Sequence, residues 1–421
     1  MKGAQSPLYS GKFWIWLLGL ASVLLLVNAA HPVWGFFGHR RINRLAVFTL
    51  PPEMGAFFKK NIEYITEHAV DPDKRRYSTR HEAVRHYIDI DHWGTYPFPE
   101  VPRNWTDALI KYATVNLVTG RGDTLILHAD TLGGAQPVFN FRDSESGLSL
   151  EVPARRYRQF FRDRILPQYY EDEWVVDCDS LSGLFGENAR KLNCTQAYVV
   201  DHFSEYGILP YHLLKMQRDL TEAFRLKNVN RILRLSAEMG HYIGDAHVPL
   251  HTTENYNGQM TGQDGIHAFW ESRLPELYAD KEYDFWVGSA EYLEDPHAFF
   301  WKTVLDSHAL VDSVFAIEKD LRRTFPADQQ YCFEERLGIT VRTQCEAFAR
   351  AYSDRMQGMV EARMRQAIHA VASSWYTAWV DAGQPDLMAL RTTALSKSEQ
   401  QELEDLEARF KAGAQKGRQH E

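Results

Sequence analysis

The stretch that decides the architecture is 241-HYIGDAHVPLH-251. His241 and Asp245 are four residues apart, so on a helix they lie on one face and can bind the same metal ion. Pro249 ends that helix, and His251 follows with freedom to turn toward the same pocket. His247 falls on another face, where we expect it to support the metal ligands from behind.

A second pair of the same kind follows in 265-GIHAFWE-271. His267 and Glu271 are again four apart, and two such pairs on facing helices predict a metal site in the core of a bundle. One pair alone is more often a surface ion pair or a structural histidine. Both pairs together with His251 favour a metal, and imidazole with carboxylate but no thiolate suits zinc.

Around these two motifs, apolar residues recur at the spacing of a helix over 42–49, 54–65, 210–224, 228–248, 309–323 and 341–380. The stretch from about 94 to 190 differs, since it holds several glycines and short β-like runs such as 123–127. We therefore predict an all-α, multi-helix single domain over 34–385 with an irregular or small β insertion at about 94–190. Residues 386–421 are polar and predict a solvated helix or tail.

The amino terminus has the pattern of a secretory signal. Lys2 and Lys12 precede an apolar run over 13–27, and small residues follow it at 28–30. The run has 15 residues, whereas a membrane-spanning helix needs about 20. We expect residues 1–33 to be a signal peptide of a secreted or periplasmic protein, with an uncleaved anchor as the alternative.

Export changes the interpretation of the four cysteines. In an oxidising compartment an even number of cysteines indicates disulfides. Cys178 with Cys194 and Cys332 with Cys345 are the local pairings, and other connectivities remain open. No two of them form a CxxC pair, which argues against a zinc ribbon or a redox motif.

The composition excludes some classes of protein. The 421 residues are 44% hydrophobic and 24% charged, as in an ordinary globular domain, and carry a net charge of −9. That acidic balance argues against a stable complex with nucleic acid, which needs many cations against the phosphates. A local site for a single phosphate stays compatible with it.

The amino-terminal half supplies matching pieces: Trp34 and His39 in 34-WGFFGH-39, Asp71 in 69-AVDPDKRR-76, and His86 in 85-RHYIDID-91. With the histidine and carboxylate pairs above, this set resembles the zinc-dependent phospholipase C and single-strand-specific nuclease superfamily. The resemblance spans residues 34–275 and leaves 94–190 unmatched. It implies an all-helical fold with three zinc ions.

The resemblance also implies roles for the matched residues. One zinc would be held by Asp71, His86, His241 and Asp245, a second by His251, His267 and Glu271, and a third by Trp34, His39 and Asp245. A metal-bound water would be the nucleophile, and Lys74 beside the catalytic Asp71 would stabilise phosphate charge. Tyr87 and Asp89 would stack on and hydrogen-bond a nucleic-acid base. A solvated basic turn for Lys74 and core packing for Tyr87 are the alternatives.

Two branches of the family remain open for the substrate. Glu271 is typical of the phospholipase branch, whereas the spacing from Trp34 to His39 is nearer to the nucleases. Val33 before Trp34 is also a poor cleavage position, which leaves the free amine of Trp34 open. We expect a zinc phosphodiesterase that acts on phospholipid head groups at a membrane surface. The alternatives are a single-strand nuclease or nucleotidase, and a non-catalytic zinc-binding protein.

Overall fold

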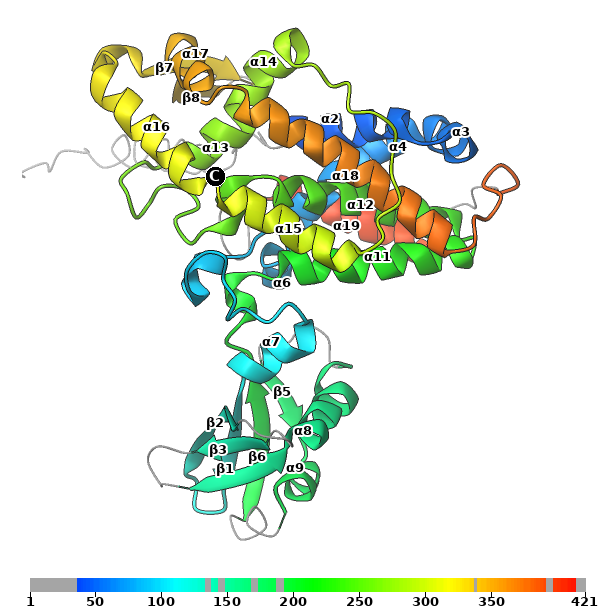
Figure 1. Cartoon of the computed structure of the whole chain (residues 1–421), viewed down its shortest axis with the longest axis vertical. Helices are drawn as coiled ribbons and strands as arrows, with labels where there is room; N and C mark the ends of the chain where they lie inside the picture. Colours follow the sequence, from blue (N-terminus) through cyan, green and yellow to red (C-terminus); the bar gives the residue numbers. More distant parts are fainter. Residues whose placement is uncertain are drawn as a thin grey trace, which may run out of the picture.

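The computed structural model describes residues 36–132, 138–142, 148–167, 173–186, 193–336, 339–390 and 397–413. In these ranges the chain forms a helical body and, below it in Figure 1, a smaller lobe built on a sheet. The expected signal peptide and Trp34 lie outside the described residues.

The helical body contains most of the helices. They are α2 (Phe36–Ala46), α3 (Pro52–Lys60), α4 (Ile62–Glu67), α5 (Asp71–Arg75), α6 (Arg80–Ala83), α11 (Leu209–Arg225), α12 (Val229–Ala246), α13 (Ile266–Ala268), α14 (Leu274–Glu282), α15 (Pro296–His308), α16 (Val311–Thr324), α17 (Glu346–Arg355) and α18 (Met359–Asp381). Short turns join them: η1 (Val47–Thr49), η2 (His68–Val70), η3 (Ile90–Trp93), η5 (Ser204–Tyr206), η6 (Pro249–Thr252), the π-helical η7 (Phe269–Arg273) and η8 (Ala327–Gln329).

Helix α12 is the centre of the body. The Asn228 side chain caps its start by accepting a hydrogen bond from the Arg231 amide at 3.1 Å. Every residue from 235 to 246 is buried, so α12 is covered on all sides by other helices, which include α2, α11 and α18. Pro249 opens η6 directly after it, as the sequence predicted. The histidine-rich end of α12 therefore lies inside the body.

The sheet lobe is larger and more regular than the expected insertion. Its six strands pair antiparallel in the order β4-β3-β2-β1-β6-β5. The strands are β1 (Thr114–Thr119), β2 (Thr124–Leu132), β3 (Val138–Arg142), β4 (Ser149–Pro153), β5 (Glu173–Val176) and β6 (Cys194–Val200). The helices of this lobe are α7 (Trp105–Tyr112), α8 (Ala154–Phe160), the π-helical η4 (Phe161–Ile165) and α9 (Cys178–Phe185).

This sheet makes the all-α prediction wrong. Alternate residues of its strands, such as Val115, Leu127 and Val199, point to one face and form a core of their own with Tyr157 and Phe161. A second, two-stranded sheet joins β7 (Tyr331–Arg336) to β8 (Ile339–Gln344), where the sequence predicted the start of a helix at 341. The chain combines a helical body with antiparallel sheets.

Aromatic side chains hold the two lobes together. Trp105, the first residue of α7, packs against both hydrophobic cores. The centre of its ring lies 5.3 Å from that of Tyr211 in α11. The ring of Phe203 stacks on that of Tyr112, with their centres 5.3 Å apart. The sheet lobe therefore attaches through packed rings as well as through the chain itself.

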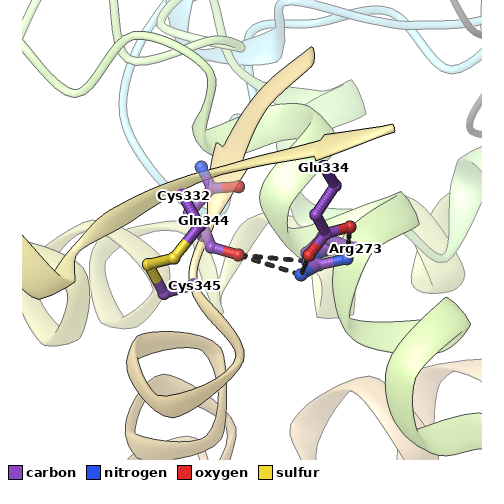
Figure 2. Close-up of a disulfide and its surroundings, with 5 residues drawn as sticks. All are labelled: Arg273, Cys332, Glu334, Gln344 and Cys345. Carbon is purple, nitrogen blue, oxygen red and sulfur yellow. Dashed lines mark hydrogen bonds and ion pairs between the residues drawn. A yellow bond between two sulfur atoms is a disulfide. The ribbon is translucent and has the colours of Figure 1, made fainter. Parts of the chain in front are cut away.

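Both local disulfide pairings are confirmed. Cys178–Cys194 ties α9 to β6 in the sheet lobe, and Cys332–Cys345 closes the β7–β8 hairpin (Figure 2). Two disulfides agree with an oxidising, extracellular environment. Among the described helices, none is long and apolar enough to cross a membrane.

The polar segment near the carboxyl terminus forms α19 (Lys397–Lys411), which packs on α5. Its Phe410 ring lies 5.9 Å from the Phe36 ring and 5.2 Å from the Tyr77 ring. Glu407 accepts a hydrogen bond from Lys74 at 2.6 Å. This part of the expected tail is therefore a docked helix.

Candidate metal centre

Seven segments bring histidines and carboxylates together in the helical body. His39 comes from α2, Asp73 from α5, His86 from the turn after α6, His241 and Asp245 from α12, His251 from η6, His267 from α13, and Glu271 from η7. They form three groups that could each hold a metal ion: His39 with His241 and Asp245, Asp73 with His86 and His241, and His251 with His267 and Glu271.

The group of Asp73, His86 and His241, taken with the adjoining Asp245, has the dimensions of a tetrahedral site. His86 Nδ1 lies 3.0 Å from His241 Nε2 and 3.0 Å from Asp245 Oδ2. Asp73 Oδ1 lies 3.6 Å from His241 Nε2 and 3.8 Å from His86 Nδ1. Zinc bonds of about 2.0–2.1 Å place tetrahedral ligand atoms about 3.3 Å apart. These four side chains therefore fit one zinc-sized ion.

The group of His251, His267 and Glu271 contains the other predicted pair, His267 and Glu271. Glu271 Oε2 lies 2.8 Å from His267 Nε2 and 3.3 Å from His251 Nε2. The Glu271 side chain is 14% exposed, whereas both histidines are only 2% exposed. Three ligands with one partly exposed edge resemble catalytic zinc sites, which keep a coordination position for water or substrate.

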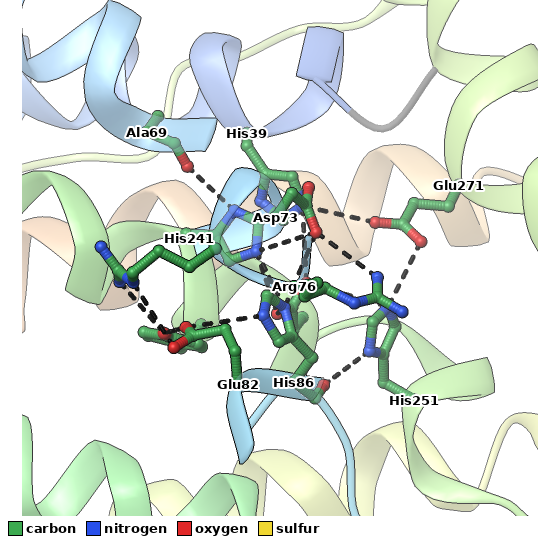
Figure 3. A network of polar contacts seen from close by, with 12 residues as sticks. His39, Ala69, Asp73, Arg76, Glu82, His86, His241, His251 and Glu271 are labelled. Carbon is green, nitrogen blue, oxygen red and sulfur yellow. Dashed lines mark hydrogen bonds and ion pairs between the residues drawn. The ribbon is translucent and has the colours of Figure 1, made fainter. Parts of the chain in front are cut away.

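His39, which forms the remaining group with His241 and Asp245, lies between the other two groups. Its Nε2 lies 3.4 Å from Asp245 Oδ1 and 3.5 Å from Glu271 Oε1, and its ring stacks on His241 at 3.8 Å (Figure 3). Asp245 thus faces His86 and His241 with one oxygen and His39 with the other, a position from which one carboxylate can reach two ions. Trp34, the other expected ligand here, lies outside the described residues.

The aspartate beside His86 is Asp73, not the expected Asp71. Residues two apart on a helix differ by about 200° in direction, so the two carboxylates of α5 face opposite sides. Asp71 accepts from His68 at 2.5 Å and lies 3.3 Å from Lys74 Nζ. Neither Asp71 nor Lys74 is brought into the three groups. The structure places Asp73 there, and Arg76, one turn further, lies over it with Nη1 3.6 Å from Asp73 Oδ1.

The two residues expected to bind a base are buried. Tyr87 is 3% exposed and its hydroxyl donates to the Glu205 carbonyl at 3.0 Å, in line with the core-packing alternative. Asp89 is 4% exposed, and its amide donates to the Tyr206 carbonyl at 2.7 Å. Neither side chain is presented to a substrate in this structure.

His247 lies behind the ligands, as its helical position indicated. Its Nδ1 bonds to the Ile243 carbonyl at 2.7 Å, and its own carbonyl accepts from Arg363 at 2.9 Å. It lines a small cavity of about 30 Å³ together with His39 and Glu271. His247 therefore shapes the back wall of the site without pointing at a metal group.

Three of the imidazoles are each held by a second contact. The Nδ1 atoms of His241, His251 and His267 face the carbonyls of Ala69 at 2.9 Å, His86 at 2.6 Å and Tyr256 at 3.2 Å. An Nδ1–H that donates to a carbonyl leaves the lone pair on Nε2, the atom that faces the groups. The tautomers are thus set for metal binding.

The hairpin next to η7 anchors the Glu271 turn. Arg273, two residues after Glu271, donates to both oxygens of Glu334 on β7 and to the Gln344 carbonyl at 3.0 Å (Figure 2). Cys332–Cys345 closes the same hairpin. The π-helical turn that carries Glu271 is therefore fixed from outside the metal groups, and such turns often occur at functional sites.

Two glycines and an asparagine were not identified from the sequence. A Cβ at Gly244 would meet His39 Nδ1 at 2.9 Å, and one at Gly240 would meet Asn43 Oδ1 at 1.9 Å. Asn43 donates to the Ala237 carbonyl at 2.9 Å. The spacing of the two glycines, one turn apart on α12, is the signal that could have indicated the close approach of α2, which brings His39 to Asp245.

Electrostatics favour a cation at this position. Burial first, then the neighbouring imidazoles, lower the pKa of His86 and His241 well below the ordinary value, so both rings are neutral at pH 7. Burial, then Glu271 and Asp73, raise the pKa of Asp245 well above its usual range. Burial also acts to raise the pKa of Glu271, but His251 and the other imidazoles outweigh it and lower that pKa.

The carboxylates of Asp73, Asp245 and Glu271 and the imidazoles around them form a donor set without thiolate. A bound divalent ion would remove the repulsion that raises the pKa of Asp245. Nitrogen and oxygen donors of this kind suit zinc and other first-row divalent metals. No protein-family model and no curated protein sequence matches this chain significantly.

Proposed function

We propose that this protein is a zinc-dependent phosphodiester hydrolase. The observation that carries the proposal is the joined set of donor groups, in which Asp245 and His39 connect a four-ligand group to a more open three-ligand group. Neighbouring metal sites of this kind serve hydrolysis of phosphate esters. Zinc held there would activate a water and draw charge from the phosphoryl oxygens.

The chain's own residues would position the substrate. The side chains of Asp73 and Glu271 are 20% and 14% exposed, which marks the accessible edge of an otherwise buried cluster. Arg76 is buried, at 3% exposed, next to Asp73 (Figure 3), so its guanidinium would act from inside the cluster and not from its accessible edge. Its guanidinium is suited to bind two oxygens of a phosphate and to stabilise the charge that develops there.

Phospholipid head groups are the substrate that we favour. Tyr87 and Asp89, which would bind a base in a nuclease, are buried and engaged with the chain. Glu271 also corresponds to the phospholipase branch of the family that the sequence resembles. Cleavage of a head group needs no stacking platform, so the burial of Tyr87 does not affect it.

The test is hydrolysis by the zinc-loaded protein of phosphatidylcholine in mixed micelles and of single-stranded DNA, measured side by side. Release of phosphorylated head group, abolished by chelation, supports the proposal. DNA cleavage alone would replace the lipid substrate with nucleic acid. A folded, zinc-loaded protein that hydrolyses neither would identify a non-catalytic zinc-binding protein.

A further inference from the structure

Glu82 is a buried carboxylate beside the metal groups that belongs to none of them. It lies in α6 and is fully buried. Arg85 donates to its Oε2 at 2.7 Å, and Arg75 Nε lies 3.4 Å from the same oxygen. The hydroxyl of Tyr242 donates to its Oε1. Two arginines and a tyrosine thus fix the orientation of this carboxylate.

The ring that Glu82 faces is that of His86. Glu82 Oε1 lies 3.9 Å from His86 Nε2, on the side of the ring opposite to the metal groups (Figure 3). His86 Nδ1 faces inward, 3.0 Å from both His241 Nε2 and Asp245 Oδ2. If Nδ1 provides the lone pair for a metal, Nε2 must carry the ring proton. Glu82 Oε1 lies within ion-pair distance of that nitrogen, although 3.9 Å is longer than a direct hydrogen bond, so Glu82 acts on the ring through its charge.

His86 differs in this respect from three other histidines of the centre. His241, His251 and His267 face backbone carbonyls through Nδ1 and the metal groups through Nε2. His86 is reversed, and its outer neighbour is a carboxylate. A carboxylate makes the opposite ring nitrogen a stronger donor than a carbonyl does, because it stabilises the positive charge that metal binding places on the ring.

We propose that Glu82 is a positioning residue of the metal centre, which selects the tautomer of His86 and strengthens Nδ1 as a metal donor. The inference rests on the proposed function, because it requires that the group of His86, His241, Asp245 and Asp73 binds metal. The alternative is that Glu82 only compensates the charges of the partly buried Arg75 and Arg85.

Glu238 provides a matched control for that alternative. It is also buried, at 9% exposure, and accepts from Arg75 at 2.7 Å. Its contact with Arg75 lies in the same network, and it belongs to none of the three metal groups. Glu238→Gln therefore removes a charge from the Arg75 network and leaves the outer partner of His86 in place.

The experiment compares full-length wild type, Glu82→Gln, Glu82→Asp and Glu238→Gln. Zinc affinity of each metal-free protein is measured by competition with a chromophoric chelator, and the visible spectrum is recorded with saturating Co²⁺. Apo thermal melts report folding. We expect Glu82→Gln to weaken zinc binding by about 10–100-fold and to change the Co²⁺ spectrum. Glu238→Gln should lower the apo melting temperature but keep the affinity and spectrum of wild type.

Equal losses of affinity in Glu82→Gln and Glu238→Gln, or wild-type affinity in Glu82→Gln, would overturn the inference. If Glu82→Gln does not fold, Glu82→Asp decides, since it keeps the charge but withdraws it from His86: weakened binding supports the role and wild-type binding contradicts it. A wild-type protein that binds no zinc would instead overturn the metal centre itself, so the two failures are separate.

Discussion

Asp71 and Asp73 lie two residues apart on α5 and serve opposite sides of it. Asp71 contacts His68 and Lys74, and through Lys74 the carboxyl-terminal helix α19, whereas Asp73 faces His86 and His241. The helix thus separates a carboxylate that contacts α19 through Lys74 from one that faces the candidate metal ligands, within a single turn. This relationship yields the most direct mutational contrast in the molecule.

Asp73→Asn should weaken zinc binding by more than about 100-fold, because it removes a donor and not merely an outer partner, whose loss costs 10–100-fold. Asp71→Asn should keep the zinc stoichiometry of wild type. Calorimetric titration of the metal-free proteins with zinc measures both. A loss of zinc in Asp71→Asn with zinc retained in Asp73→Asn would contradict this and show that Asp71, as the sequence predicted, is the ligand.

The two neighbouring cations give a parallel contrast in activity. Arg76→Met should lower kcat by about 10²–10³, the usual cost of removing a group that stabilises developing charge. Lys74→Met should change kcat by less than about threefold and stability by less than about 1 kcal/mol, since Lys74 forms a partly exposed ion pair with Glu407. Steady-state hydrolysis of the head group by zinc-loaded proteins tests this. Equal losses of kcat would refute the assignment of Arg76.

The close approach of α2 to α12 predicts a large effect at Gly240. Gly240→Ala should destabilise the protein by about 1–3 kcal/mol, because the added Cβ would meet Asn43 Oδ1 at 1.9 Å. Gly183→Ala in α9 is the control, since nothing lies within 4 Å of its added Cβ. That change should stabilise by up to about 1 kcal/mol through helix propensity. Urea unfolding measures both, and similar effects at the two positions would contradict the packing argument.

A buried histidine away from the ligands predicts a pH dependence. Burial first, then Arg85 and Lys215, lower the pKa of His212 well below 6.5. The unfolded chain therefore takes up a proton below about pH 6.5 that the folded chain does not, and stability falls as the pH falls from 6.5 toward the folded pKa. The slope from one such group is about 1.4 kcal/mol per pH unit.

His212→Gln should remove that part of the slope in urea unfolding of the metal-free protein between pH 6.5 and 5. His128→Gln, which changes an exposed histidine of β2, separates the loss of a buried histidine from the loss of any histidine. An unchanged slope in His212→Gln would show that acid destabilisation arises elsewhere.

Most residues of the candidate metal centre could be predicted from the sequence, because their spacing along the chain is local. The pair His241 and Asp245 and the pair His267 and Glu271 each occupy one helical face, and Pro249 marks where the chain turns to bring in His251. The choice between Asp71 and Asp73 could not be made this way. Both lie in the same short helix, and only its packing against α12 on one side and α19 on the other decides which carboxylate faces the histidines.

The six-stranded sheet could not be predicted from the sequence for a different reason. Its strands are short, and β1 lies between β2 and β6, which is some eighty residues away in the chain. Pairing of that kind leaves little local periodicity, since β3 and β4 have only five residues each. The disulfides were easier, because each closes a short local loop.

That the protein hydrolyses phosphodiesters with zinc is best tested by measuring the rate of hydrolysis as zinc is returned to chelator-treated protein. We expect no hydrolysis of a chromogenic phosphodiester by the metal-free protein, and a rate that rises with added zinc and saturates at a small whole number of ions per chain. A rate that does not depend on zinc, or a folded and zinc-saturated protein with no hydrolysis, would contradict it.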